Sequence, residues 1–167
     1  MRETPDTLIY GLHLPAVYRF ALLMTGSVPV AAEVLRLTVE QAERGDLSDV
    51  RDPRRMRRWL FARARTLCSR PLDLPESLGS PALHADGMDP ASADPAEDPV
   101  RRLPALFGHL PEPERSALAL FYLYVFLPDE LAEVLEVKPP VLTELLNRGR
   151  ALLGKAEGRR QKVEVES

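Results

Sequence analysis

The sequence predicts an all-α protein made of two small helical domains. Hydrophobic residues make up 45% of the chain but aromatic residues only 6%, so a packed core must rely on leucine, valine and alanine. Leucine and alanine are strong helix formers. Apolar side chains recur with helical spacing in residues 5–70 and 100–158. Residues 71–99 between them hold six prolines, which remove backbone donors. We therefore expect two helical domains joined by a partly disordered linker.

Three helices are expected in the domain at residues 5–70. The first covers residues 14–24 and stops before Gly26, and the second runs from about residue 30 to residue 44. The third begins at Pro53, a favourable first-turn residue, and continues to about residue 69. On a helical wheel this third helix separates an apolar side from a basic side. The apolar side holds Met56, Leu60, Ala64, Leu67 and Cys68, and the basic side holds Arg54, Arg55, Arg58 and Arg65.

A helix–turn–helix is expected in the domain at residues 100–158. One helix is predicted over residues 112–124, a short one over residues 128–135, and a last one from Pro139 to about residue 153. Gly154 and Gly158 should fray that last helix, and the polar tail behind them should be disordered. A helix–turn–helix is a common frame for binding nucleic acid. This domain therefore predicts a nucleic-acid contact.

Charge is distributed unevenly along the chain. The net charge is −3, but residues 1–70 carry +4, residues 71–99 carry −7 and residues 100–167 are neutral. Residues 51–70 hold eight arginines against one acid, with Trp59 and Phe61 among them. Arginine with interleaved aromatics suits single-stranded DNA, whose bases stack and whose phosphates need cations. The alternative is a solvated arginine face with Trp59 in the core.

The sequence contains no constellation typical of an enzyme. The single cysteine, Cys68, rules out an internal disulfide framework and a cysteine-rich zinc site, and the three histidines lack ligand spacing. We expect no catalytic residue, no metal, no other cofactor and no small-molecule substrate. No apolar run approaches the ~18 residues of a membrane span, and the first residues are unlike a signal peptide. A cytoplasmic protein with no membrane contact is expected.

Two separated sets of segments resemble one protein family in the same order. The first domain contains VYRFALLMTG, AAEVL and RRWLFARARTLCSR, and the second contains LPEPERSALAL, DELAEVLEV and NRGRALL. They resemble, respectively, the promoter −10-binding and −35-binding domains of the extracytoplasmic-function sigma factors, over about 120 residues. The resemblance implies a non-enzymatic protein of bacterial transcription initiation. It would bind RNA polymerase core and promoter DNA, and an anti-sigma protein could hold it inactive.

The resemblance assigns candidate DNA contacts in both domains. Glu144 departs from the family's pattern because it would point a negative charge toward phosphates, and Glu136 stands where the family's turn usually has glycine. In the last helix, the alternative is a solvated helix end whose arginines complement the macrodipole. The candidate DNA-binding residues are Arg54, Arg55, Arg58, Trp59 and Arg65 in the first domain, and Lys138, Thr143, Arg148 and Arg150 in the second.

A candidate polymerase- or partner-binding patch comprises Val34, Leu37 and Thr38. In the family this part of the second helix usually reads Asp-Leu-Val-Gln-Glu and grips the polymerase. Apolar groups cannot replace a carboxylate or amide in interfacial hydrogen bonds, and each lost partner costs ~1–3 kcal/mol. Extra apolar residues on a surface would instead suit a different protein partner. The alternative is a shift in register that makes these positions part of the core.

Two functions from different classes remain open at the level of sequence. The first is a sigma factor with diverged contacts. The second is a degenerate sigma-like interaction module that binds a protein such as an anti-sigma factor without initiating transcription. The acidic linker also has two interpretations. It is either a soluble tether, or a DNA mimic whose seven carboxylates lie over the arginine face and inhibit it.

Overall fold

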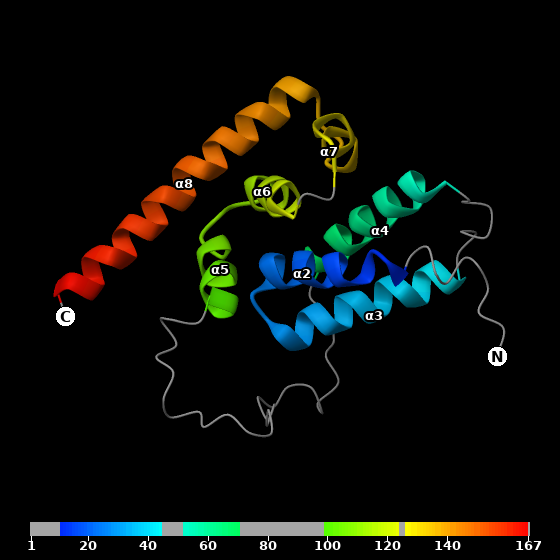
Figure 1. The fold of residues 1–167 in the computed structure, drawn as a ribbon, viewed down its shortest axis with the longest axis horizontal. Helices are drawn as coiled ribbons and strands as arrows, with labels where there is room; N and C mark the ends of the chain where they lie inside the picture. The colour runs from blue at the N-terminus through cyan, green and yellow to red at the C-terminus, as the bar shows by residue number, and fades with distance from the viewer. Residues whose placement is uncertain (1–10, 45–51, 71–98, 124–125, 167) are drawn as a thin grey trace.

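The computed structural model describes residues 11–44, 52–70, 99–123 and 126–166, and every regular element among them is helical (Figure 1). The predicted all-α class is therefore confirmed. The predicted linker lies outside the described residues, apart from Pro99 at its end. The described helices are α2 (Leu14–Thr25), α3 (Val28–Arg44), α4 (Pro53–Cys68), α5 (Pro99–Phe107), α6 (Glu114–Tyr122), α7 (Pro128–Val134) and α8 (Pro139–Glu166).

Helices α2, α3 and α4 begin and end within about two residues of their predicted limits, because local signals set their ends. Helix α2 stops at Gly26, whose φ of 66° is left-handed and whose N–H donates to the Leu22 carbonyl at 2.8 Å. Helix α4 is capped by Asp52, whose carboxylate accepts the Arg54 N–H at 2.9 Å, and Pro53 fills its first turn. Helix ends that depend on such neighbouring residues can be predicted from the sequence.

Helices α6 and α7 confirm the predicted pair, but two features at the ends of this half were not foreseen. Helix α5 was not predicted, since Pro104 inside it and the prolines before it obscured its pattern. Helix α8 was predicted to end near residue 153, and this is wrong: it continues through Gly154 and Gly158 to Glu166. A glycine costs only about 1 kcal/mol within a helix. That cost does not stop a helix already propagating from a packed segment.

Helices α2–α4 and helices α5–α8 form two halves of the molecule, and the halves pack into one body. Helix α2 contacts α5 and α6, helix α4 contacts α7, and a single hydrophobic core includes side chains from both halves. Phe61 of α4 is fully buried at the centre of this junction. Its ring lies edge-on to Phe20 of α2, with centroids 5.8 Å apart, and to Phe126 beside α7, at 5.1 Å. Aromatic pairing therefore crosses the boundary between the two halves.

Hydrogen bonds from Arg115 of α6 to backbone carbonyls also join the halves. Its guanidinium donates to the Met24 carbonyl at the end of α2, at 3.0 Å, and to the Leu110 carbonyl at 2.7 Å. Helix-terminal carbonyls have no partner within their own helix. Arg115 satisfies one of them at the end of α2, although it lies 91 residues further along the chain. Nothing in the sequence pattern identifies this residue as a cross-link.

Helix α8 crosses α6 at Gly149, and we predict opposite effects of alanine at Gly149 and at Gly154. A Cβ at Gly149 would lie 2.7 Å from Cδ1 of Leu118, a fully buried side chain, whereas nothing lies within 4 Å of a Cβ at Gly154. Overpacking costs about 1–3 kcal/mol and exceeds the gain in helix propensity. Gly149→Ala should lower the free energy of unfolding and the melting temperature. Gly154→Ala should raise both, with a gain of about 1 kcal/mol in the free energy of unfolding. Equal stabilisation by both would refute the close crossing.

Candidate nucleic-acid interface

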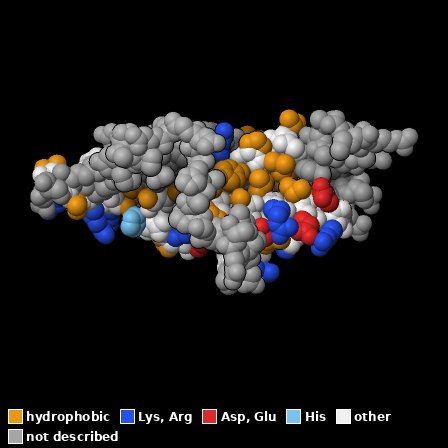
Figure 2. Space-filling view, turned by 90° about the horizontal axis from the view of Figure 1, so that it is seen from below, with side chains coloured by type: hydrophobic (Ala, Val, Ile, Leu, Met, Phe, Trp, Pro, Cys, Tyr) orange, Lys and Arg blue, Asp and Glu red, His pale blue; other side chains and the backbone are white. Residues whose placement is uncertain are grey.

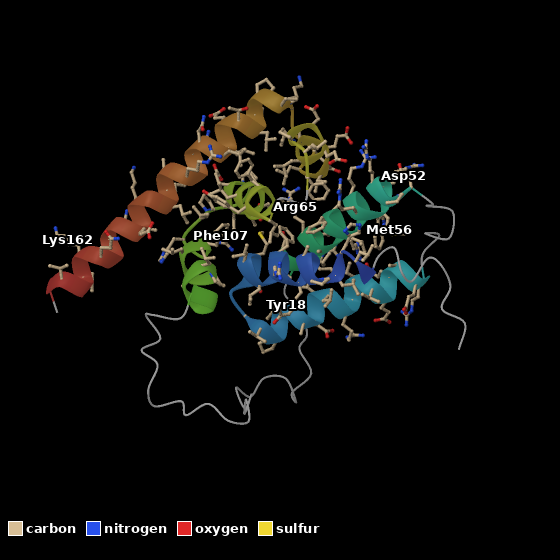
Figure 3. The ribbon with its side chains drawn as sticks, in the orientation of Figure 1. Tyr18, Asp52, Met56, Arg65, Phe107 and Lys162 are labelled. Atoms are coloured by element: carbon tan, nitrogen blue, oxygen red, sulfur yellow. The ribbon has the colours of Figure 1, made fainter. Side chains whose placement is uncertain are left out.

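Helix α4 separates apolar from basic side chains as the sequence predicts. Met56, Leu60, Ala64 and Leu67 are buried, while Cys68 is half-buried. Figure 3 shows Asp52 at the start of the helix and Arg65 near its other end, beside α6. The candidate DNA contacts on α4 differ in exposure. Arg54 and Arg55 are exposed, whereas Arg58, Trp59 and Arg65 are half-buried.

Trp59 packs against the hydrophobic core as a partly buried side chain. This placement agrees with the alternative in which the tryptophan is mainly a core residue. The part of the tryptophan ring that packs on the core is not available to stack on a base. Phe61, the other aromatic residue of α4, is wholly buried and is also unavailable for stacking on a base. Stacking therefore contributes less to this surface than its cations do.

Part of the arginine face is occupied by carboxylates from α7. Arg57 donates from one nitrogen to both oxygens of Glu130, at 2.9 Å each, and its guanidinium lies 5.1 Å from the centroid of the Phe126 ring. Arg58 pairs with Glu133. The sequence analysis did not single out Arg57, Glu130 or Glu133 as functional. The available signal was the spacing of the two glutamates, three residues apart on one face of a helix.

Arg57 sits in a more enclosed setting than its neighbours. Its side chain is 23% exposed and that of Glu130 is 15% exposed, so this ion pair is partly withdrawn from water. Its Nε is buried and has no hydrogen-bond partner among the described residues. The pKa of His13 is lowered by burial first and then by the positive charge of Arg57.

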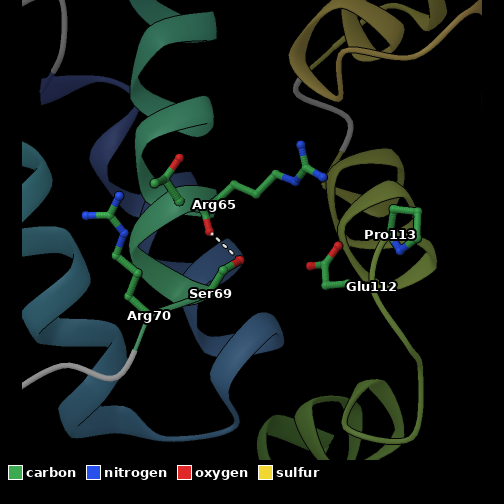
Figure 4. Close-up of a pocket in the computed structure, with 6 residues that line it drawn as sticks. Arg65, Ser69, Arg70, Glu112 and Pro113 are labelled. Carbon is green, nitrogen blue, oxygen red and sulfur yellow. Dashed lines mark hydrogen bonds between the residues drawn. The ribbon is translucent and has the colours of Figure 1, made fainter.

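A groove separates the end of α4 from the start of α6. It is lined by Arg65, Thr66, Ser69, Arg70, Glu112 and Pro113. Figure 4 shows the Arg65 side chain extending toward Glu112 and the α6 side of the groove, and the Ser69 hydroxyl donates to the Arg65 carbonyl at 3.1 Å. Burial, and then the charge of Glu112, raise the pKa of the Cys68 thiol to about 12. Cys68 is therefore a protonated, weakly nucleophilic thiol at neutral pH.

The candidate residues in and just before α8 are all exposed, but two of them also make contacts within the molecule. Lys138 and Thr143 are exposed, and the Thr143 hydroxyl donates to the Pro139 carbonyl at 3.3 Å. Arg148 pairs with Glu144 and, at 3.0 Å, with the buried Glu114 of α6. The guanidinium of Arg150 lies 4.9 Å from the centroid of the Phe121 ring. These two arginines therefore contribute to packing of α8 on α6.

The turn between α7 and α8 uses an unusual backbone conformation at Glu136. Its φ is 56°, the one positive φ of a non-glycine residue in the described ranges. Side chains with a Cβ disfavour this left-handed region, which glycine adopts readily. Glutamate therefore occupies the position where the resemblance led us to expect glycine. The turn is formed all the same, with the Val137 N–H donating to the Ala132 carbonyl at 3.0 Å.

The structure corrects the expected surface patch on α3. Val34 and Thr38 are 0% exposed, and the Thr38 hydroxyl donates to the Val34 carbonyl at 2.7 Å. Leu37 is partly buried against the core. The expectation that Val34 and Thr38 face solvent is therefore wrong, because they share one helical face with other core residues. Neither side chain can contact a partner in this fold, and the alternative of core positions describes them correctly.

The opposite side of α3 carries a charged network instead. Arg36 pairs with Glu33 at 2.7 Å and with Glu40 at 2.8 Å, and Arg44 pairs with Glu40 at 2.6 Å. Hydrogen bonds from Arg36 are the main reason that the pKa of Glu33 is lowered. Figure 2 shows the molecule from below and displays acidic and basic side chains clustered beside hydrophobic ones. Any surface that α3 offers to a partner is therefore mixed in charge.

Comparisons with known proteins leave the family of the chain open. Within the described residues, no three His, Cys, Asp or Glu side chains are grouped so that they could hold a metal ion. No described helix is long and apolar enough to cross a membrane. No family model matches the chain, and a search of curated proteins finds no significantly similar sequence.

Proposed function

We propose that this protein is a sigma-factor-like protein of bacterial transcription initiation, which binds promoter DNA and RNA polymerase core and has no catalytic activity of its own. The observation that carries the proposal is the arginine face of α4, where Arg54 and Arg55 are exposed and Arg58 and Arg65 are partly so. Guanidinium groups bind phosphate oxygens in a bidentate manner. The order of the family-like segments and the all-helical fold support the same assignment.

In this proposal the two halves contribute differently to DNA binding. Helix α4 supplies most of the cationic contact, and the start of α8 supplies Thr143, with Lys138 immediately before the helix. Arg148 and Arg150 are exposed but also contact Glu114 and Phe121 of α6, so we infer that this second DNA contact is the weaker one. Phosphate contacts dominate affinity and make it depend on salt. A salt titration is therefore the direct test of which helix carries the binding.

We predict that Arg54→Ala, Arg58→Ala and Arg65→Ala together flatten the salt dependence of DNA binding. Each phosphate contact contributes about 0.7–0.9 to the slope of log K against log salt, so three losses reduce the slope by about 2–3. Fluorescence anisotropy with a promoter-like oligonucleotide at several salt concentrations measures this change. A control triple variant loses the same charge at exposed arginines elsewhere: Arg19→Ala, Arg44→Ala and Arg159→Ala. Equal slopes for the two triple variants would remove α4 as the DNA contact.

The second candidate function is a sigma-like module that binds a protein partner, such as an anti-sigma factor, without initiating transcription. The observation that favours it is the number of arginines already engaged within the chain, since Arg57, Arg58 and Arg148 all pair with glutamates. Binding to purified RNA polymerase core separates the two functions. A sigma-like protein should bind core polymerase and direct it to DNA. If the protein binds neither core polymerase nor DNA, the sigma-factor function is excluded and the interaction module is the function that remains.

A further inference from the structure

The contact between α4 and α7 combines three interactions on one small surface. We call it the clasp and define it by Arg57 and Arg58 of α4 and by Phe126, Glu130 and Glu133 at α7. Arg57 pairs with both oxygens of Glu130, Arg58 pairs with Glu133, and Arg57 stacks over Phe126. The clasp therefore places two carboxylates against two consecutive arginines of α4, of which Arg58 belongs to the face that we propose binds DNA and Arg57 lies beside it.

The two carboxylates compete with DNA for the same donors. A carboxylate and a phosphate both present a pair of oxygens that a guanidinium can engage. One nitrogen of Arg57 is held between both Glu130 oxygens, and its guanidinium also lies over the Phe126 ring. Arg58 is held by a single, more exposed ion pair with Glu133. While the clasp is closed, the guanidinium nitrogens that pair with Glu130 and Glu133 cannot donate to phosphate oxygens.

The clasp also has features of a contact that can open. Its acidic side is provided by α7, a helix of seven residues. Burying an ion pair nearly cancels its own electrostatic gain through desolvation. The Nε of Arg57 is buried without a partner in the closed form, and this adds a further cost that water would relieve on opening. A competing polyanion therefore needs to supply little additional free energy to displace α7.

We propose that the clasp is an autoinhibitory contact, in which Glu130 and Glu133 occupy arginines of α4 until α7 moves away and DNA phosphates replace them. This inference rests on the proposed function, because it concerns the regulation of the same arginine face. The apparent DNA affinity is then the intrinsic affinity reduced by the fraction of molecules in the open form. Weakening the clasp should raise that fraction and the affinity together.

The test neutralises the acidic side of the clasp in the full-length chain. Glu130→Gln with Glu133→Gln should raise affinity for a promoter-like oligonucleotide at least about tenfold at low salt, by enlarging the open fraction. A control with the same change in net charge replaces exposed carboxylates outside the clasp, as Asp129→Asn with Glu43→Gln. The gain must exceed that of the control, since added positive charge alone strengthens DNA binding.

A second readout reports opening without DNA. Cys68 is the only cysteine, and its thiol pKa is raised by burial and by Glu112, which belongs to the other half of the molecule. Because α7 packs on α6, which begins two residues after Glu112, movement of α7 away from α4 should also draw Glu112 from Cys68. That should lower the thiol pKa and speed alkylation at a fixed pH, so the Glu130→Gln, Glu133→Gln variant should react faster than the wild type and the control. Circular dichroism establishes that the variant remains folded.

The outcomes separate the inference from the function on which it depends. Higher DNA affinity together with faster Cys68 alkylation, both beyond the control, supports the autoinhibitory clasp. Salt-dependent DNA binding by the wild type, with no extra gain in the variant, overturns the clasp and leaves the proposed function intact. Absence of DNA binding by wild type and variant alike overturns both. Unchanged alkylation of Cys68 in the variant also contradicts opening of the halves.

Discussion

Val34→Asp should destabilise the protein by about 4 kcal/mol or more, enough to unfold most of it. Val34 is 0% exposed in the core of the first three helices. The substitution forfeits about 1.5–3 kcal/mol of apolar burial and adds several kcal/mol for an unpaired buried carboxylate. Natural domains have only ~5–15 kcal/mol of stability to lose. Urea denaturation followed by circular dichroism measures the change.

The matched control for this substitution is Ala32→Asp, at an exposed position two residues earlier on the same helix. It introduces the same carboxylate without burying it, so its cost should stay within about 1 kcal/mol. If the Val34→Asp variant were as stable as the Ala32→Asp variant, Val34 would have to be exposed to solvent rather than buried. It would also restore the interpretation of Val34, Leu37 and Thr38 as a diverged polymerase patch, which depends on their exposure.

Phe61→Ala should lower the free energy of unfolding by about 3–5 kcal/mol, the range for a large aromatic removed from a core. Phe61 is fully buried and contacts Phe20 from one half and Phe126 from the other. The loss therefore affects both halves, and the change in melting temperature should appear in one cooperative transition. Thermal unfolding measured by circular dichroism and by calorimetry tests both points.

Phe61→Leu is the matched control, because it keeps most of the apolar volume and removes only the ring contacts. A near-volume-conserving exchange of this kind costs less than about 1.5 kcal/mol. If Phe61→Ala were as mild as Phe61→Leu, the side chain would not be packed between the halves. Two separate transitions in the wild-type protein would likewise show that Phe61 does not join them into one unit.

These expectations alter how the arginine face is understood. The sequence offered the acidic linker as a possible mimic of DNA, but the linker lies outside the described residues, and the carboxylates found on α4 come from Glu130 and Glu133. The sequence also made Arg148 and Arg150 candidate DNA contacts, beside the alternative of a solvated helix end, and both contact groups on α6. Each difference arises because a charged side chain takes the partner that the fold brings closest.

The helical class, most helix limits and the apolar side of α4 can be predicted from the sequence. These properties depend on capping residues, on proline and glycine, and on the 3.6-residue period, all of which act over a few positions. The same period placed Val34 and Thr38 among possible core residues but could not choose between the two sides of α3. That choice depends on which neighbour covers each side, and the neighbours are distant in sequence.

The availability of each arginine and the contact between the two halves depend on the folded arrangement of the helices. The pairing of Arg57 with Glu130 joins residues 73 positions apart, and the Arg115 contact with the Met24 carbonyl joins residues 91 positions apart. The sequence shows that a guanidinium can bind a carboxylate, a carbonyl, an aromatic ring or a phosphate, because the chemistry is common to all. Which of these it contacts is settled by packing of α4 on α7 and of α6 on α2.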